Sequence, residues 1–247
     1  MNKIAIIGGS RFTSLENFVT THCTTVNTPY GEPSAPLSYG LLGEREVVFL
    51  PRRGSEAPMP PHKINYRANI WALRDSGVQT VIATAAVTGI GDLYPIGALV
   101  VPDQLIDYTY GRDNTFFGDD QAVSHIDFTY PYSESLRKII LNQAQSMGVE
   151  IHAGSTYGIL QGPRYETYAE GMRLLHDGCH LIGMTGMPEA TLARELGLDY
   201  ALIAIVTRST HSTKGTSNNS QKADEEVCQG EKQLADLIEQ ILRDPTN

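Results

Sequence analysis

Short apolar runs alternate along the chain with longer segments in which apolar residues recur every three or four positions. The first pattern predicts buried strands and the second predicts amphipathic helices. The predicted strands are Lys3–Ile7, Val47–Leu50, Val81–Val87, Ala98–Val101, Leu105–Ile106, Tyr157–Leu160 and Tyr200–Val206. The predicted helices are Tyr66–Ser76, Glu134–Met147, Tyr168–His176, Ala190–Leu196 and Lys222–Leu242. Gly77, Gly148 and Gly197 follow three of these helices, as is typical of helix ends.

This alternation of strands and helices predicts a three-layer α/β/α fold with a mixed or mostly parallel central sheet. No linker-like stretch divides the 247 residues, so we expect a single domain over residues 1–247. The segment Ser209–Ser220 is almost wholly polar, which predicts a loop.

Composition narrows the classes of function. Hydrophobic residues make up 41% and charged residues 19%, as in ordinary globular proteins. The net charge of −9 argues against a nucleic acid or an anionic membrane as partner. The three cysteines are far apart, and the seven histidines show no metal-binding spacing, so reduced thiols and no metal are expected. We read neither a signal peptide nor a membrane-spanning run and therefore expect a cytoplasmic protein.

Two polar segments follow predicted strands and suit an anion. Gly8-Gly9-Ser10-Arg11 offers backbone amides and a hydroxyl, although a plain tight turn explains it equally well. Arg52 and Arg53 can bind phosphate or carboxylate bidentately, although paired arginines are more commonly solvated. Their position favours the binding role, because ligands of open α/β sheets collect beyond the carboxyl ends of strands. The segment Ala86–Gly89 also falls there.

Two further segments suit a flat heterocycle and a sugar. In Gln161–Thr167, Tyr165 can stack on a ring and Glu166 can accept from a ring N–H, or Glu166 can simply be an early-helix acid. In Gly183–Glu189, Thr185 can donate to an anion at the following helix. The methionines there offer apolar surface, or simply belong to the core.

Together these segments resemble the trimeric purine nucleoside phosphorylase family, and within it the branch of 5′-methylthioadenosine and 5′-methylthioinosine phosphorylases. The resemblance covers nearly the whole chain. It is carried by IAIIGGS, TPYGEPSAPL, HKINYRANIWAL, DQLIDYT, HIDFTYPY, QGPRYETYAE and GMTGMPEATLARELGL. NYRANIWAL and MTGMPEA, in this order and at this spacing, are specific.

The resemblance implies a homotrimer in which inorganic phosphate cleaves the N-glycosidic bond of a purine nucleoside without a metal or organic cofactor. The expected phosphate-binding residues are Ser10, Arg52, Arg53, Ala86 through its backbone, and Thr185. The expected nucleoside-binding residues are Tyr165, Glu166, Met184, Thr207, Arg208 and, reaching into the neighbouring subunit, His125. Glu166 and Arg208 are expected to carry the chemistry at the base.

The expected purine base follows from comparing the hydrogen-bond donors and acceptors of Glu166 with those of the purine ring. A 6-oxopurine has an N1–H donor, which an ionised Glu166 can accept, whereas a 6-aminopurine has an acceptor at N1. In the family, glutamate here goes with 6-oxopurines and a small residue with methylthioadenosine. The expected substrate is therefore S-methyl-5′-thioinosine, and the expected products are the free purine and 5-methylthioribose 1-phosphate.

The chain also departs from the family pattern. Arg11, Arg53, Ala57 and Thr88 stand where the family usually has glycine, histidine, histidine and glycine. Arg208 stands where the family has the asparagine or aspartate that bonds purine N7. Arginine can only donate, so it fits N7 or O6 but not a 6-amino group.

These departures leave alternatives open. Inosine, guanosine or methylthioadenosine are alternative substrates, and a hydrolytic nucleosidase is an alternative enzyme, against which the paired arginines argue. A non-catalytic nucleoside-binding relative with an altered phosphate site is the alternative outside enzymes.

Overall fold

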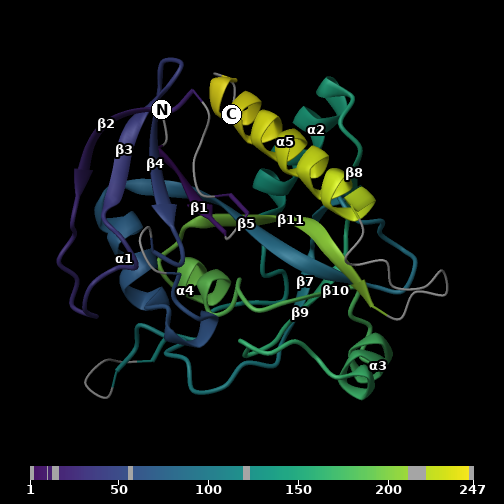
Figure 1. The fold of residues 1–247 in the computed structure, drawn as a ribbon. Helices are drawn as coiled ribbons and strands as arrows, with labels where there is room; N and C mark the ends of the chain where they lie inside the picture. Colours follow the sequence, from purple (N-terminus) through teal and green to yellow (C-terminus); the bar gives the residue numbers. More distant parts are fainter. Residues whose placement is uncertain are drawn as a thin grey trace.

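The computed structural model describes residues 3–9, 11–12, 17–54, 58–118, 123–210 and 221–244. Within this part of the chain, eleven strands form one mixed sheet (Figure 1). The strands are β1 Lys3–Gly8, β2 Val19–Thr24, β3 Leu37–Leu42, β4 Arg45–Pro51, β5 Val78–Ile90, β6 Leu99–Val101, β7 Gln104–Asp107, β8 Ile151–Ala153, β9 Thr156–Ile159, β10 Leu181–Gly183 and β11 Asp199–Thr210.

The centre of the sheet is parallel. Strand β1 lies between β4 and β5, and β11 runs along the other edge of β5, all four in the same direction. Strand β10 is antiparallel to β5 and joins it to β9 and β7, while β6 and β8 extend the sheet beyond β11. The carboxyl ends of β1, β4, β5 and β11 therefore meet at one edge of the sheet.

Helices cover both faces of the sheet, and each covering helix buries an apolar side. The helices are the short 3₁₀ helix η1 Pro61–Lys63, α1 Tyr66–Asp75, α2 Glu134–Met147, α3 Tyr168–His176, α4 Glu189–Glu195 and α5 Gln221–Arg243. Helices α1 and α4 pack on one face, with Ile70 and Leu192 in its core. Helices α2 and α5 pack on the other, with Ile140 and Leu237.

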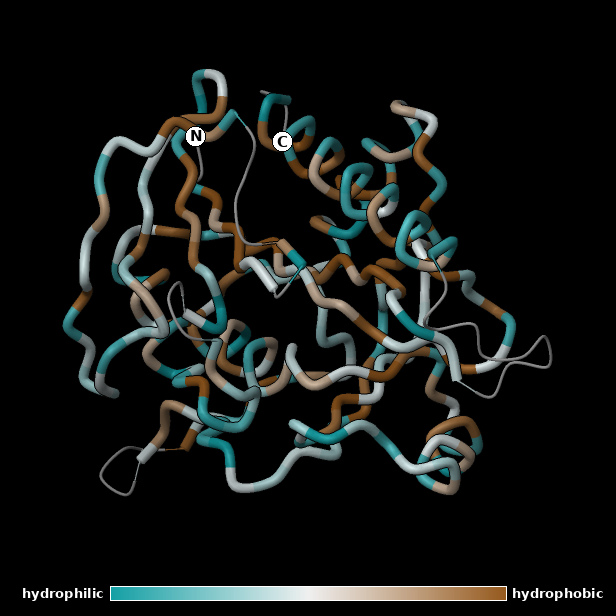
Figure 2. The backbone as a smooth tube through the Cα atoms, viewed as in Figure 1, coloured by the Kyte–Doolittle hydropathy of each residue, from teal (hydrophilic) through white to brown (hydrophobic). Residues whose placement is uncertain are grey.

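The predicted three-layer α/β/α fold is therefore confirmed. Apolar residues are concentrated along the central strands between the helical layers (Figure 2). Neighbouring residues of β5 enter opposite cores, since Val81 belongs to the core under α1 and α4 and Ile82 to the core under α2 and α5. This two-sided burial explains why the central strands were visible as continuous apolar runs.

The observed elements extend the predictions in some places and correct them in others. Strands β2, β3, β8 and β10 were not predicted. Strand β2 is exposed along its whole length, and β8 and β10 have only three residues each. The predicted loop Ser209–Ser220 is wrong for Ser209 and Thr210, which belong to β11. The remaining residues, 211–220, lie outside the described part of the chain. No helix of that part is both long and apolar enough to cross a bilayer.

The contact between α5 and the loop before β6 requires glycine. A Cβ at Gly230 would lie 2.3 Å from the Gly97 carbonyl oxygen, a backbone atom that cannot easily move aside. Alanine is favoured over glycine inside helices by roughly 1 kcal/mol, so helix propensity alone predicts that Gly230→Ala stabilises the protein. We expect the opposite, a loss of roughly 1–3 kcal/mol in the free energy of unfolding, because of overpacking.

Urea unfolding measures this change. Gly118→Ala is the matched control and is expected to be nearly neutral, because an added Cβ there has no atom within 4 Å. A Gly230→Ala protein more stable than the parent would contradict the packing argument.

Candidate functional site

A break in strand pairing on one edge of β5 defines the site. Strand β1 pairs with β5 as far as Ala83, and β10 pairs with it from Thr88 onward. Both lie on the edge opposite β11, which pairs with β5 from Thr80 to Ile90. No strand of the described chain covers residues 84–87 on that edge. The backbone there is free to bind something other than a strand.

A pocket of about 220 Å³ opens at this break. Its walls come from the ends of β1, β4, β5, β10 and β11 and from the segment before α3. The lining residues are Gly9, Arg52, Arg53, Pro61, Ala85, Ala86, Val87, Thr88, Pro163, Tyr165, Glu166, Ile182, Gly183, Met184, Thr185, Thr207 and Arg208. The pocket thus brings together most of the residues singled out from the sequence.

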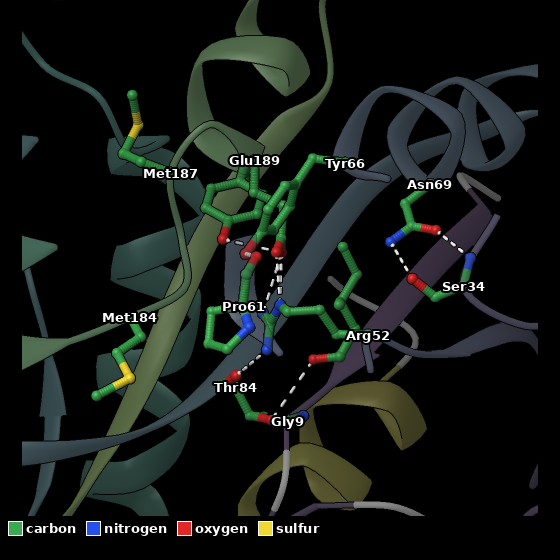
Figure 3. A network of polar contacts seen from close by, with 12 residues as sticks. Gly9, Ser34, Arg52, Pro61, Tyr66, Asn69, Thr84, Met184, Met187 and Glu189 are labelled. Carbon is green, nitrogen blue, oxygen red and sulfur yellow. Dashed lines mark hydrogen bonds and ion pairs between the residues drawn. The ribbon is translucent and has the colours of Figure 1, made fainter. Parts of the chain in front are cut away.

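Arg52 is held in place by a buried ion pair that the sequence did not reveal (Figure 3). Its Nε lies 2.5 Å from Glu189 Oε2, and its Nη2 donates to Oε1 at 3.0 Å. Its Nη1 donates to the Thr84 carbonyl oxygen at 2.7 Å. Both charged side chains are only 1% exposed. Three of the five guanidinium N–H groups are occupied in this way, which leaves two for a ligand.

Electrostatics keeps Arg52 charged despite its burial. Burial by itself would lower the pKa of the Arg52 guanidinium, but the Glu189 carboxylate beside it has the larger combined effect and raises that pKa above its ordinary value. A buried cation with free donors is therefore present at the floor of the pocket.

Backbone amides complete this end of the pocket. The Thr84 carbonyl faces the break, because it accepts from Arg52. Alternate residues of a strand direct their backbone groups to the same edge, so the Ala86 N–H faces the break as well. Gly9 approaches closely: its N–H donates to Thr84 Oγ1 at 2.9 Å, and a Cβ on it would lie 2.9 Å from the Thr84 carbonyl oxygen. Glycine is required there for contact, not for turn geometry.

A β-bulge places Arg208. Val206 pairs with Val87 and Arg208 pairs with Thr88, so Thr207 is an extra residue in β11. In a regular strand, Val206 and Arg208 would point to the same face of the sheet, because they are two residues apart. Here they pair with the neighbouring residues Val87 and Thr88, which point to opposite faces, so the bulge turns Arg208 to the face opposite Val206. The guanidinium carbon of Arg208 lies 4.0 Å from the centre of the Tyr165 ring. Its Nε is buried and has no hydrogen-bond partner among the described residues.

Glu166 lines the pocket instead of capping the helix. Thr167 is the N-cap of α3, and it forms a capping box with Glu170. Arg164 pairs with Glu170 at 2.7 Å, and this contact, followed by the hydrogen bond from the Thr167 N–H, lowers the pKa of Glu170 to about 2. The reading of Glu166 as an early-helix acid is therefore wrong, since α3 begins at Tyr168 and Glu170 serves its first turn.

The remaining expected residues are distributed as follows. Met184 and Thr185 line the pocket, whereas Met187 is buried in the core and accepts from Thr191. Arg53 lines the pocket while its Nε donates to the Met59 carbonyl oxygen. His125 is exposed and does not line the pocket of its own chain.

Two of the singled-out positions, Ser10 and Ala57, lie outside the described residues. Arg11, which could have added charge near Ser10, lies 3.5 Å from Glu231 of α5 and is absent from the pocket lining.

Sequence reasoning missed Glu189 and Thr84 as parts of the site. Glu189 was visible only as an acid in the first turn of a helix, and its partner Arg52 is 137 residues away. The one signal in the sequence was that Arg52 and Glu189 each adjoin a strongly apolar segment, where a charged side chain needs a partner.

The pocket on this α/β fold thus combines the buried Arg52, the Ala86 N–H that faces the break, and Glu166 and Arg208, a set that suits an anion beside a heterocycle, as in a phosphorylase. The sequence pattern of the phosphorylase superfamily matches residues 3–243, and the chain belongs to that family. It is thus an enzyme of the nucleoside phosphorylase kind, a pentosyltransferase.

Relatives and solved structures agree with this assignment. A Pseudomonas syringae pv. tomato protein named "Probable S-methyl-5′-thioinosine phosphorylase" is 49% identical over 83% of this chain and 84% of its own. The 6-oxopurine nucleoside phosphorylase of Pyrococcus furiosus is 41% identical over 98% of this chain and 91% of its own. Methylthioadenosine phosphorylase from Schistosoma mansoni, solved with adenine, superposes with a TM-score of 0.89 at 32% identity, over 98% of this chain and 91% of that chain.

The Arg52–Glu189 pair is expected to be a major stability element. Arg52→Ala leaves the Glu189 carboxylate buried without its cation, so we expect the free energy of unfolding to fall by roughly 3–5 kcal/mol. The double variant Arg52→Ala with Glu189→Ala should be less destabilised than the sum of the two single variants, because neither charge is then left alone.

Chemical denaturation of the four proteins measures this coupling. Additive losses would show that the pair contributes no more than its separate side chains. Arg243→Ala, which breaks the exposed pair with Glu239, is the control and is expected to change stability by less than about 1 kcal/mol.

Proposed function

We propose that the protein phosphorolyses a 6-oxopurine nucleoside with a 5′-methylthio group, S-methyl-5′-thioinosine, to the free purine and 5-methylthioribose 1-phosphate. The observation that carries the proposal is that Glu166 and Arg208 line the same pocket as Arg52. An acceptor and a donor suited to the two edges of a 6-oxopurine thus share one space with a buried cation. The names of several relatives support the same reaction class.

Phosphate is proposed to bind at the floor of the pocket. The two free N–H groups of Arg52, the Ala86 N–H and the Thr185 hydroxyl would donate to its oxygens. Arg53 would add positive charge nearby, and Ser10 would complete the group as the sequence suggests. Hydrogen bonds to Glu189 and Thr84 support this role, because they hold the Arg52 guanidinium in one orientation.

The purine is proposed to lie between Glu166 and Arg208. Glu166 accepts from N1–H, and Arg208 donates to O6 and N7, the same pair of acceptors that arginine binds on guanine in nucleic acids. Tyr165 is proposed to line the base pocket, and Met184 to pack against the sugar. Thr207 lies beside Arg208, where its hydroxyl donates to the Val87 carbonyl oxygen at 3.3 Å.

These contacts suggest how the reaction proceeds. A phosphate oxygen forms a bond to the anomeric carbon while the bond from that carbon to N9 breaks, and the electron pair of the broken bond passes to the purine. Negative charge on the purine is stabilised by Arg208. Because arginine does not release its proton, the departing purine takes a proton from solvent, and the new phosphate ester returns its own proton to solvent, so the charges balance. Binding both reactants side by side supplies much of the remaining rate enhancement.

We further propose that the enzyme acts as a homotrimer in the cytoplasm with no metal or organic cofactor. The exposed His125, outside the pocket of its own chain, supports a site completed by a neighbouring subunit. The cysteines, all free in the structure, support a reducing compartment.

The base preference tests the central claim. Purified protein with phosphate should cleave S-methyl-5′-thioinosine in preference to S-methyl-5′-thioadenosine, because a carboxylate facing the N1 acceptor of adenine is left without a partner. Glu166→Ser should reduce that preference by about tenfold or more. Steady-state kcat/KM for both nucleosides, with and without phosphate, measures it.

Glu170→Gln is the matched control. It changes an acid four residues away that caps α3 and does not line the pocket, so stability should fall while base preference stays the same. A parent enzyme that prefers the adenine nucleoside would contradict the base assignment. Base release without phosphate would indicate hydrolysis, and nucleoside binding with no release would indicate a non-catalytic relative.

The oligomeric state is a separate prediction. Light scattering at micromolar concentration should give three times the chain mass of 27.0 kDa. His125→Ala should leave that mass unchanged and raise the KM for the nucleoside, because the imidazole is proposed to act at the sugar of the neighbouring site. A monomeric parent would disprove the shared site.

A further inference from the structure

Arg112 lies in the loop after β7, and its guanidinium contacts two segments of the site. Its Nη2 donates to the carbonyl oxygens of Leu160, Gln161 and Met184 at 3.3, 2.9 and 3.0 Å. Its Nη1 donates to the Met187 carbonyl oxygen at 2.6 Å, and its Nε donates to Gln161 Oε1 at 3.0 Å. Among the described residues, none of its partners is a carboxylate.

The two segments joined by Arg112 both contribute to the lining of the pocket. Leu160 and Gln161 lead directly into the base segment, residues 163–166, which includes Tyr165 and Glu166. Met184 and Met187 flank Thr185 in the sugar and phosphate segment. The contact residues Gln161 and Met184 are 23 positions apart in the chain. Arg112 does not itself line the pocket, so it can act only through them.

A third contact leads toward the phosphate end. Arg112 Nη1 donates to the Tyr66 hydroxyl at 3.3 Å, and that hydroxyl donates to the Pro61 carbonyl oxygen at 3.0 Å. Pro61 lines the pocket. The guanidinium carbon also lies 5.4 Å from the centre of the Tyr66 ring. Burial raises the pKa of Tyr66 above its ordinary value, so the hydroxyl keeps the proton that it donates.

The chemistry of the partners explains why arginine is needed. Carbonyl oxygens are neutral, so Arg112 does not neutralise a negative charge here. What it supplies is a planar fork of five donors whose directions match acceptors on separate loops. Lysine carries the same charge but only three donors on a single atom, and it cannot bind all these acceptors at once.

We propose that Arg112 is a positioning residue that sets the distance between the base segment, residues 163–166, and the sugar and phosphate segment, residues 183–187. This inference rests on the proposed function for its catalytic consequence, although not for the contacts themselves. Misplacing a reactant by about 1 Å can lower an enzyme's rate about a hundredfold, so loosening these segments should affect catalysis strongly.

Hydrogen exchange of the full-length protein tests the contacts directly. Arg112→Met removes every donor at similar length, and Arg112→Lys keeps the charge. In both variants, amides of residues 160–167 and 183–188 should exchange at least about tenfold faster than in the parent, while those of α2 and α5 stay unchanged. Arg173→Met is the control, because Arg173 also lies over a tyrosine ring, that of Tyr108 at 5.7 Å, without bonding these loops.

Kinetics tests the consequence. With S-methyl-5′-thioinosine, both Arg112 variants should raise the KM values of the nucleoside and of phosphate and lower kcat by about tenfold to hundredfold, and Arg112→Lys should be no more active than Arg112→Met. A purely structural role would reduce the amount of active enzyme and leave both KM values as they were.

The outcomes separate the two proposals. Unchanged exchange in both segments would overturn the role of Arg112, as would activity restored by lysine or loss of folding in both variants. A parent protein that cleaves no nucleoside would overturn the proposed function alone. The exchange comparison, together with calorimetric titration of hypoxanthine, would then still decide whether Arg112 positions the pocket.

Discussion

The site depends on one buried charge and its neutralisation. Arg52 follows a central strand, is almost fully enclosed, and remains charged because Glu189 on α4 faces it. The pairing therefore dictates where α4 begins relative to β4, and with it the position of the segment that carries Met184 and Thr185. An isolated buried guanidinium would be strongly unfavourable, whereas this pair leaves two donors for a ligand. If phosphate binds as proposed, stability and ligand binding both depend on this one side chain.

The fold could be predicted largely from the sequence because its central strands are buried on both faces. Such strands are continuous apolar runs, and the helices between them have clear periodicity and glycine stops. Strands that are exposed or very short were harder to find in this way. The exposed strand β2 has no apolar pattern, and β10 is only three residues long, although it forms one side of the pocket.

The sequence singled out many of the residues that line the pocket but not how they are arranged. Arg52, Glu166, Met184 and Arg208 were singled out individually, and they line one pocket. What could not be predicted is how distant residues meet: the Arg52–Glu189 pair, the bulge at Thr207, and the contacts of Arg112 with two loops. Each of these features depends on contacts between segments that are far apart in the chain, and the sequence of one segment does not indicate which other segment it meets. The sequence also left open whether Glu166 belongs to the first turn of a helix, and the structure shows that this helix begins two residues later.

The break in pairing along β5 has a consequence for how this sheet is held together. Unpaired strand edges usually invite association with other chains, and proteins avoid leaving them open. Here the break is internal and spans only residues 84–87, flanked by β1 and β10, so there is too little room for a foreign strand to pair. A small oxyanion can bind there, and it would give Ala86 the hydrogen-bond acceptor that a neighbouring strand gives elsewhere. The ligand would then take the place of a strand at this gap, and the hydrogen bond at Ala86 would be lost and formed again in every catalytic cycle.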